Sequence, residues 1–202
     1  TFKGESMNKI IKGITVIIIL LTLIINIGFT FDAQANTYYV SPDGNDDNTG
    51  LSTSNAWASI ERVNSETFQP GDAILFESAG TFYGQMRPQG NGEPGKPITI
   101  SSYGRGPKPI INIGEEEGAG ITLINQSWWE IQGIEITSGA PPELGIWRGG
   151  IIATVEGEDI QIEHIVIRDC YIHDIWGLVG GDKSGLAIYV GQRVLGDPKC
   201  IN

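Results

Sequence analysis

Short runs of β-branched and aromatic residues alternate along the chain with clusters of Gly, Pro, Asn and Asp. The runs are residues 37–40, 72–77, 97–103, 109–113, 120–124, 129–137, 150–155, 160–175 and 185–191. Such residues favour strands, and the polar clusters between them favour turns. The pattern therefore predicts an all-β protein, either a solenoid, a sandwich or a barrel, and an internal repeat would identify the solenoid.

An internal repeat is present. Residues 120–137 and 150–173 both begin with Gly-Ile, and "GLAIYVG" opens a third copy at Gly185, so the copies start 30 and 35 residues apart. Five pairs match at a constant offset of 36 within the first two copies: Ile131 and Ile167, Gly133 and Asp169, Ile134 and Cys170, Ile136 and Ile172, and Thr137 and His173. Strands of constant length separated by unequal loops predict the coils of a parallel β-helix.

The stretch "HIVIRDCYIHDIWG", residues 164–177, is predicted to form one coil of this solenoid. Alternate residues point inward, so Ile165, Ile167, Cys170 and Ile172 are expected to stack on their equivalents about 4.8 Å away. Cys170 is then expected to pack as a small buried hydrophobe, with a reactive thiol as the alternative. Arg168 and His173 are expected to point outward.

Only one stretch of the mature chain has a helical period. In "SNAWASIERVNSETF", residues 54–68, the apolar residues Trp57, Ile60, Val63 and Phe68 recur at spacings of three to five after a helix cap at Ser54 or Asn55. This predicts one short helix in an N-terminal cap of the β-helix.

The N-terminal segment resembles a targeting signal rather than part of the fold. From Met7, two lysines precede the apolar run "ITVIIILLTLII", and "AQA" at 33–35 provides a small-residue cleavage site. Residues 1–35 are therefore predicted to be a signal peptide with upstream residues, and residues 36–202 the β-helix domain. A retained membrane anchor is the alternative, although a span needs about 20 apolar residues. We expect a chain that is secreted or lies in the periplasm or on the surface of a bacterium.

Charge limits the choice of partners. Cleavage before Asn36 removes three of 13 basic and two of 24 acidic residues, which leaves a formal charge of −12. Such an acidic chain disfavours nucleic acid and anionic membranes as partners. Cys170 and Cys200 leave both a disulfide and two free thiols open.

The segments "YYVSPDGNDDNTG", "AWASIERV" and "QPGDAILFESAGTFYGQMRPQGNGEPGKPITISSYGRGPKPII" resemble the opening of secreted right-handed parallel β-helix proteins of the pectin-lyase-like superfamily. The resemblance extends from about Asn36 to the end. It implies a cap followed by coils, and polysaccharide as the partner; we expect the complete protein to be a monomer. The superfamily includes lyases, hydrolases, epimerases and surface proteins, so the resemblance is weak evidence for the reaction.

Elimination across a uronate, as in some members, needs a base and a cation or Ca²⁺ that neutralises the carboxylate. The repeat places Arg148 and Lys183 at equivalent positions, two residues before Gly150 and Gly185, and we expect them to form a cationic pair at the surface. Outward-facing Arg168 and His173 are further catalytic candidates. Solvated turn residues, and for His173 a surface histidine bonded to Asp174, are the alternatives.

Sugar-binding candidates are Trp147 and Trp176, which lie in loops, and Tyr189, which points outward from the third copy. By contrast, Trp129 is expected to pack inward.

No metal site is predicted with any specificity. The outward positions of the first strand of each copy contain no carboxylate, which weakens a Ca²⁺-dependent lyase, although Ca²⁺ stays a candidate. These positions are Thr122, Ile124, Ile152, Thr154, Ala187 and Tyr189. "DGNDDNTG" at 43–50 begins like a calcium loop but lacks the glycine and the final acidic residue, so turns formed by its Asx side chains are expected instead.

These observations favour an extracellular lyase or hydrolase acting on cell-wall or uronate-containing glycans. The alternative is a non-catalytic surface or carbohydrate-binding β-helix. The third copy provides only its first strand, so we expect an N-terminal fragment whose main active site lies beyond Asn202.

Overall fold

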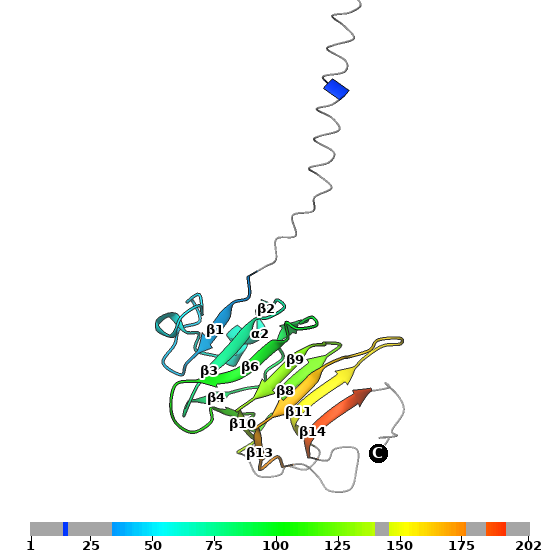
Figure 1. Cartoon of the computed structure of the whole chain (residues 1–202). Coiled ribbons are helices and arrows are strands. Elements are labelled where there is room, and N and C mark those ends of the chain that lie inside the picture. The colour runs from blue at the N-terminus through cyan, green and yellow to red at the C-terminus, as the bar shows by residue number, and fades with distance from the viewer. Residues whose placement is uncertain (1–13, 16–33, 140–145, 177–184, 193–202) are drawn as a thin grey trace, which may run out of the picture. The chain divides into compact units, whose positions relative to one another are not determined.

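Parallel strands form almost all of the regular structure of the computed structural model, and they stack in successive coils (Figure 1). The structure describes residues 14–15, 34–139, 146–176 and 185–192. The chain divides into residues 1–34, of which Ile14, Thr15 and Gln34 are described, and residues 35–202, which contain the strands. Among the described residues, no helix has the length and apolar character needed to cross a membrane.

Three parallel sheets make up the walls of the solenoid. Sheet 1 contains β1 (Thr37–Val40), β3 (Ala73–Glu77), β6 (Ile98–Tyr103), β9 (Trp129–Gln132) and β12 (Ile165–Arg168). Sheet 2 contains β4 (Thr81–Tyr83), β7 (Ile110–Asn112), β10 (Glu135–Thr137) and β13 (Tyr171–His173). Sheet 3 contains β8 (Gly118–Ile124), β11 (Arg148–Val155) and β14 (Leu186–Gln192). The strands β2 (Thr67–Phe68) and β5 (Gln89–Gly90) form a separate pair. The predicted all-β parallel β-helix is confirmed.

Isoleucines stack in ladders inside the solenoid. Ile74, Ile100, Ile131 and Ile167 pair in turn across four strands of sheet 1. Sheet 2 has the corresponding ladder Phe82, Ile111, Ile136 and Ile172, and sheet 3 has Met86, Ile121, Ile151 and Ile188. Within the first ladder, Ile74, Ile100 and Ile131 have no exposed surface. Each coil therefore buries the apolar face of its neighbour, which no coil could bury alone.

For the second and third strands of the coil, the predicted offset of 36 residues between one coil and the next is confirmed, because Ile131 pairs with Ile167 and Ile136 with Ile172. The predicted offset of 35 for the third copy is wrong. Gly149 pairs with Leu186, an offset of 37. The two-residue error keeps the same side chains inward, because side chains alternate with a period of two.

Glycines open two of the copies for a steric reason. A Cβ on Gly120 would lie 2.5 Å from Cγ2 of Ile136, and one on Gly150 would lie 2.6 Å from Cγ2 of Ile172. Both glycines therefore point toward the ladder of sheet 2, where a side chain has no room.

The predicted short helix is present but begins later than expected. A 3₁₀ turn, η1 (Thr53–Asn55), precedes α2 (Ile60–Asn64), whose N-cap is Ser59 rather than Ser54 or Asn55. The Ser59 hydroxyl accepts the amide of Arg62 at 3.1 Å, and Asp46 accepts both the Ser59 amide and its hydroxyl. Asp46 therefore helps to set where the helix starts.

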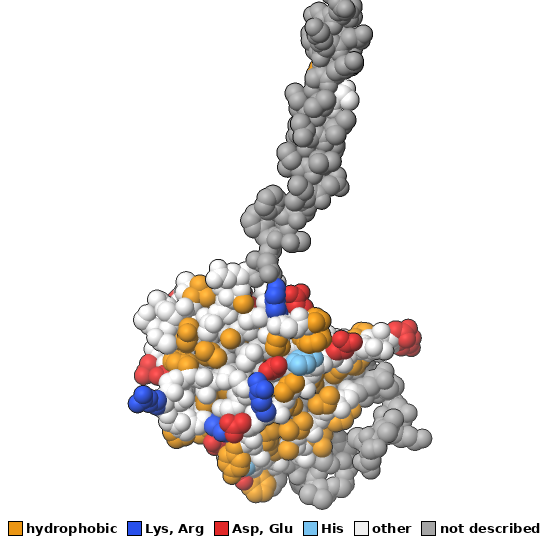
Figure 2. Space-filling model, in the orientation of Figure 1, with side chains coloured by type: hydrophobic (Ala, Val, Ile, Leu, Met, Phe, Trp, Pro, Cys, Tyr) orange, Lys and Arg blue, Asp and Glu red, His pale blue; other side chains and the backbone are white. Residues whose placement is uncertain are grey.

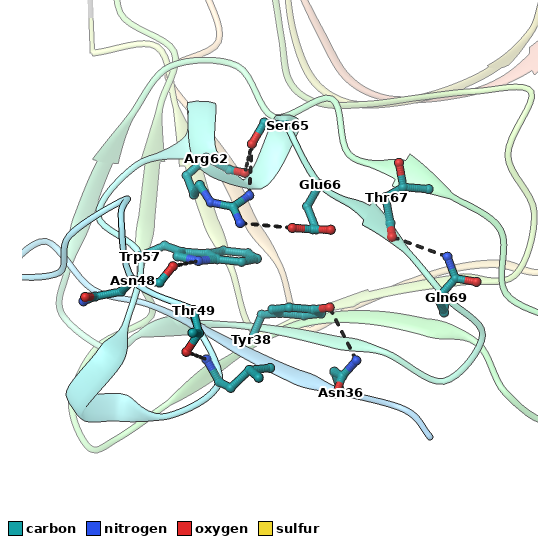
Figure 3. A network of polar contacts seen from close by, with 11 residues as sticks. Asn36, Tyr38, Asn48, Thr49, Trp57, Arg62, Ser65, Glu66, Thr67 and Gln69 are labelled. Carbon is teal, nitrogen blue, oxygen red and sulfur yellow. Dashed lines mark hydrogen bonds and ion pairs between the residues drawn. The ribbon is translucent and has the colours of Figure 1, made fainter. Parts of the chain in front are cut away.

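A layered arrangement holds the cap together (Figure 3). The ring of Trp57, which has no exposed surface, lies 4.8 Å from the ring of Tyr38, and the Arg62 guanidinium lies 4.2 Å above the same indole. Glu66 and the Ser65 hydroxyl hold Arg62 in this position. A cation over a tryptophan face is attracted by the ring, so the ion pair and the stack stabilise each other.

Candidate functional site

A charged group lies on the outer face of sheet 1, between β9 and β12. One oxygen of the Glu130 carboxylate is 3.0 Å from Nε2 of His164, and the other accepts from Nη2 of Arg168 at 2.8 Å. Nε of Arg168 donates to Oε1 of Gln132 at 2.7 Å. We call these four residues, together with Trp128, the outer-face strip.

Two aromatic rings continue the strip. The Trp128 and His164 rings stack with their centroids 4.6 Å apart and their planes 17° apart. The two residues occupy the same position before β9 and β12, and both have left-handed backbones, with φ of 62° and 51°. Such a conformation is unusual for a bulky residue. Backbone bonds hold the turn, since the Trp128 amide donates to Glu163 and its carbonyl accepts from Ile98.

The strip is accessible but ordered by its own contacts. The Arg168 side chain is 55% exposed and that of Glu130 is 18% exposed. Beside the strip, Lys108 pairs with Asp169 at 3.0 Å. On the face shown in Figure 2, basic and acidic side chains lie next to one another and near a histidine. A polar, aromatic-lined surface of this kind can bind a polar ligand that also has an apolar face.

A second cluster surrounds His173 on sheet 2. Nδ1 of His173 is 2.8 Å from the Asp174 carboxylate, and Nε2 is 3.0 Å from the Glu135 carboxylate of the neighbouring coil. The Tyr171 ring stacks 4.4 Å from the imidazole. The hydrogen bonds that the imidazole makes to the carboxylates of Asp174 and Glu135 raise the pKa of His173 above its usual value. The expected bond to Asp174 is confirmed, and both ring nitrogens are already occupied.

The expected surface position of Arg148 is wrong. Arg148 is 1% exposed and donates to the carbonyl of Glu115 at 2.7 Å and to that of Trp176 at 3.5 Å. The guanidinium is buried because the chain segments before β8 and after β13 cover the start of β11. These bonds give it a structural role, linking the two segments. Lys183 lies outside the described residues.

The predicted sugar-binding aromatic residues have different surroundings. Trp147 and Trp176 lie in loops, as predicted, and Trp176 is 43% exposed. The Trp147 carbonyl accepts the Gly118 amide at 3.0 Å, and Tyr189 is on β14, opposite Ile152. The outward positions Ile152 and Thr154 are only 7% and 4% exposed, so this part of sheet 3 offers little polar surface. Sugar binding by these three aromatic rings stays a prediction.

The predictions for Cys170, Trp129 and the turn at Asn45 agree with the structure. Cys170 packs against the core as a free thiol, and burial raises its pKa, which makes the thiolate less accessible. Trp129 is fully buried. The Asn45 side chain accepts the Asp47 amide in an Asx turn. Among the described residues, no group of three or more His, Cys, Asp or Glu side chains is arranged to hold a metal ion. Cys200 lies outside the described residues.

Sequence reasoning missed Trp128, Glu130, Gln132 and His164 as a group. The repeat offset of 36 contained the signal, because it superimposes Trp128 on His164 and Gln132 on Arg168. Applied to outward as well as inward positions, the same alignment would have placed these residues on neighbouring coils.

The fold and the exposed strip define the protein as a parallel β-helix with a polar outer surface. Comparison with solved structures gives the same fold. Two crystal structures of the GH136 lacto-N-biosidase from Eubacterium ramulus superimpose with a TM-score of 0.62 at 21% and 22% identity, covering 79% and 78% of this chain. A rhamnogalacturonan lyase superimposes with a TM-score of 0.51 at 15% identity over 78% of this chain.

The chain spans 31% and 30% of the two lacto-N-biosidase chains and 51% of the lyase chain. No protein-family model matches the sequence, and no curated protein matches it. At these identities the likeness shows the fold alone.

Proposed function

We propose that this protein is a carbohydrate-active parallel β-helix protein that binds a glycan along the outer-face strip. The observation that carries the proposal is the Glu130 carboxylate, held between His164 and Arg168 beside the exposed end of an aromatic stack. Fixed hydrogen-bonding groups next to aromatic rings suit a sugar, which has polar hydroxyls and an apolar ring face. The names of the solved neighbours, a glycosidase and a polysaccharide lyase, support the same class of ligand.

The reaction we propose for the whole protein is hydrolysis or elimination of a polysaccharide. Arg168 is the better cation for elimination, because its side chain is 55% exposed whereas Arg148 is buried. His173 is suited to hold a proton rather than to accept one, because two carboxylates face its ring nitrogens.

Non-catalytic glycan binding is the second candidate, and one observation favours it. Hydrolysis by the common mechanism needs two carboxyl groups flanking the scissile bond. Glu130 is the carboxylate of the strip, and both of its oxygens are engaged in hydrogen bonds, one with His164 and one from Arg168. The strip by itself is therefore better arranged for binding than for hydrolysis.

A panel of plant and bacterial glycans, assayed on the purified protein, tests the proposal. Binding is measured by calorimetry, hydrolysis by the release of reducing ends, and elimination by the absorbance of unsaturated uronate products. Arg168→Ala is expected to weaken binding at least tenfold. Lys96→Gln, which removes one positive charge from an exposed ion pair with Glu93, is the matched control and should leave binding unchanged. Binding that is equal in both variants would contradict the proposed site.

We also propose that the chain is exported and cleaved before Asn36. The "AQA" sequence after the apolar run supports this location. Intact-mass measurement of the protein from an expressing culture provides the test. A mature form that begins at or near Asn36 is expected, and a form that retains residues 7–35 would contradict cleavage.

A further inference from the structure

The guanidinium of Arg168 is held in a way that restricts what it can bind. Nε donates to Gln132 and Nη2 donates to Glu130. These two nitrogens form the side edge of the guanidinium, one of the two edges with which arginine makes bidentate pairs to a carboxylate. Within the described part of the chain, the third nitrogen, Nη1, has no hydrogen-bond partner. The strip therefore offers a ligand only the end edge of the guanidinium, whose positive charge the Glu130 carboxylate already balances.

The charges around this nitrogen also disfavour an acidic ligand. The positive charges in and beside the strip are already paired, since Glu130 faces Arg168 and Lys108 faces Asp169. The whole chain has a formal charge of −11. A uronate that approached Arg168 would approach the Glu130 carboxylate as well, and like charges in proximity cost free energy.

The aromatic part of the strip offers a ligand apolar contact area. Trp128 is half-buried, and it stacks on the imidazole of His164, whose side chain is 33% exposed. The edge of such a stack gives apolar contact area to the C–H face of a sugar ring. The contact area and the paired charges both match a ligand that is polar but uncharged.

We infer that the outer-face strip selects neutral sugars over uronates, and that Glu130 is the residue that determines this preference. The inference rests on the glycan-binding role proposed above and narrows its substrate class. Glu130 acts in two ways, because it balances the charge of Arg168 and places a negative charge where the carboxylate of a uronate would bind. Its replacement by Gln keeps the shape of the side chain and removes the charge.

The test compares a neutral panel with an acidic panel of the same chain lengths. The neutral probes are galacto-, gluco-, xylo- and N-acetyllactosamine-type tetrasaccharides, and the acidic probes are tetragalacturonate and tetraglucuronate. Calorimetry on the full chain is expected to show that one or more neutral probes bind at least tenfold more tightly than either acidic probe. This binding should change little between about 0.05 and 0.3 M salt, because it involves no net charge. Arg168→Ala should abolish it, and Lys96→Gln should not.

Glu130→Gln should reduce the discrimination against the uronates at least fivefold. Far-ultraviolet circular dichroism and the thermal midpoint of each variant establish that the fold is retained. Tighter binding of a uronate than of every neutral probe by the unmodified protein would overturn the inference and leave the glycan-binding role intact. Unchanged discrimination in a folded Glu130→Gln protein would overturn the role of Glu130. Binding of no probe would overturn the inference and the proposed function together.

Discussion

Replacement of Gly150 by Ala tests whether close packing between coils requires a glycine at this position. A Cβ on Gly150 would lie 2.3 Å from the carbonyl oxygen of Ala187 on β14 and 2.6 Å from Cγ2 of Ile172. The neighbouring Gly149 is the matched control. A Cβ there would lie 3.2 Å from the Trp147 ring and 3.3 Å from the Ala119 side chain, with no backbone atom as near.

The size of the effect follows from which atoms have to move. Insertion of a methyl group into a packed core costs about 1–3 kcal/mol, and the upper end applies where a backbone carbonyl of a parallel strand is displaced. A Gly-to-Ala change also restricts the unfolded chain, which offsets roughly 0.4–1 kcal/mol. Gly150→Ala should therefore lower the free energy of unfolding by about 2 kcal/mol, whereas Gly149→Ala should change it by less than about 0.5 kcal/mol.

Thermal unfolding followed by circular dichroism measures the difference between these variants. For a domain of this size, 1 kcal/mol corresponds to roughly 2–4 °C, so the midpoint of Gly150→Ala should fall by about 4–8 °C. Chemical denaturation should rank the two variants in the same order. If Gly150→Ala unfolds within 1 °C of Gly149→Ala, the packing of β14 and β13 against β11 does not depend on this glycine, and the reasoning is refuted.

Three further predictions concern other parts of the molecule. Trp129→Ala should cost about 3–5 kcal/mol by chemical denaturation, because the side chain is fully buried and its indole donates to Gly90; a loss below 1 kcal/mol would contradict this. His173→Gln should destabilise the protein most below pH about 6.5, since the raised pKa of folded His173 gives stability that is lost as the pH rises through that pKa; urea titrations that show the same difference at pH 5.5 and pH 9 would refute it. Burial tends to raise the pKa of Asp46, but bonds from Ser59 and Ala58 outweigh it and lower the pKa. Asp46→Asn should therefore destabilise the cap above pH about 4, with a difference that disappears as the pH falls through the pKa of folded Asp46, and a constant difference in acid titration would argue against it.

The inward side of the solenoid could be predicted because it repeats in the sequence. Alternating apolar residues and a constant offset identified the ladder positions of Ile131, Ile136, Ile167 and Ile172, and the structure pairs the same residues. Burial forces such positions to remain apolar in every coil, so their pattern is visible in a single chain. The third copy was misaligned by two residues because a single strand, "GLAIYVG", matches its neighbour almost equally well in either register.

The outward side was harder to predict because contacts between coils depend on which loops cover a residue. Arginine is usually a surface residue, yet the segments around Glu115 and Trp176 bury Arg148, and its guanidinium donates to their backbone carbonyls. No local sequence pattern indicates that these segments cover Arg148. Glu130 was overlooked for a related reason, since its importance depends on His164 and Arg168 in the next coil.

The connections between sheets 2 and 3 differ greatly in length along the solenoid. They are residues 113–117, 138–147 and 174–185. The turns from sheet 1 to sheet 2 are shorter, with two residues each in the last two coils, 133–134 and 169–170. Strand pairing nevertheless continues on both sides of each connection. One corner of the coil therefore tolerates insertions, because doubling the length of a flexible loop costs only about 0.6 kcal/mol. A foreign peptide introduced there should be displayed without disturbing the stack, which makes this corner the natural place to graft new binding loops onto the scaffold.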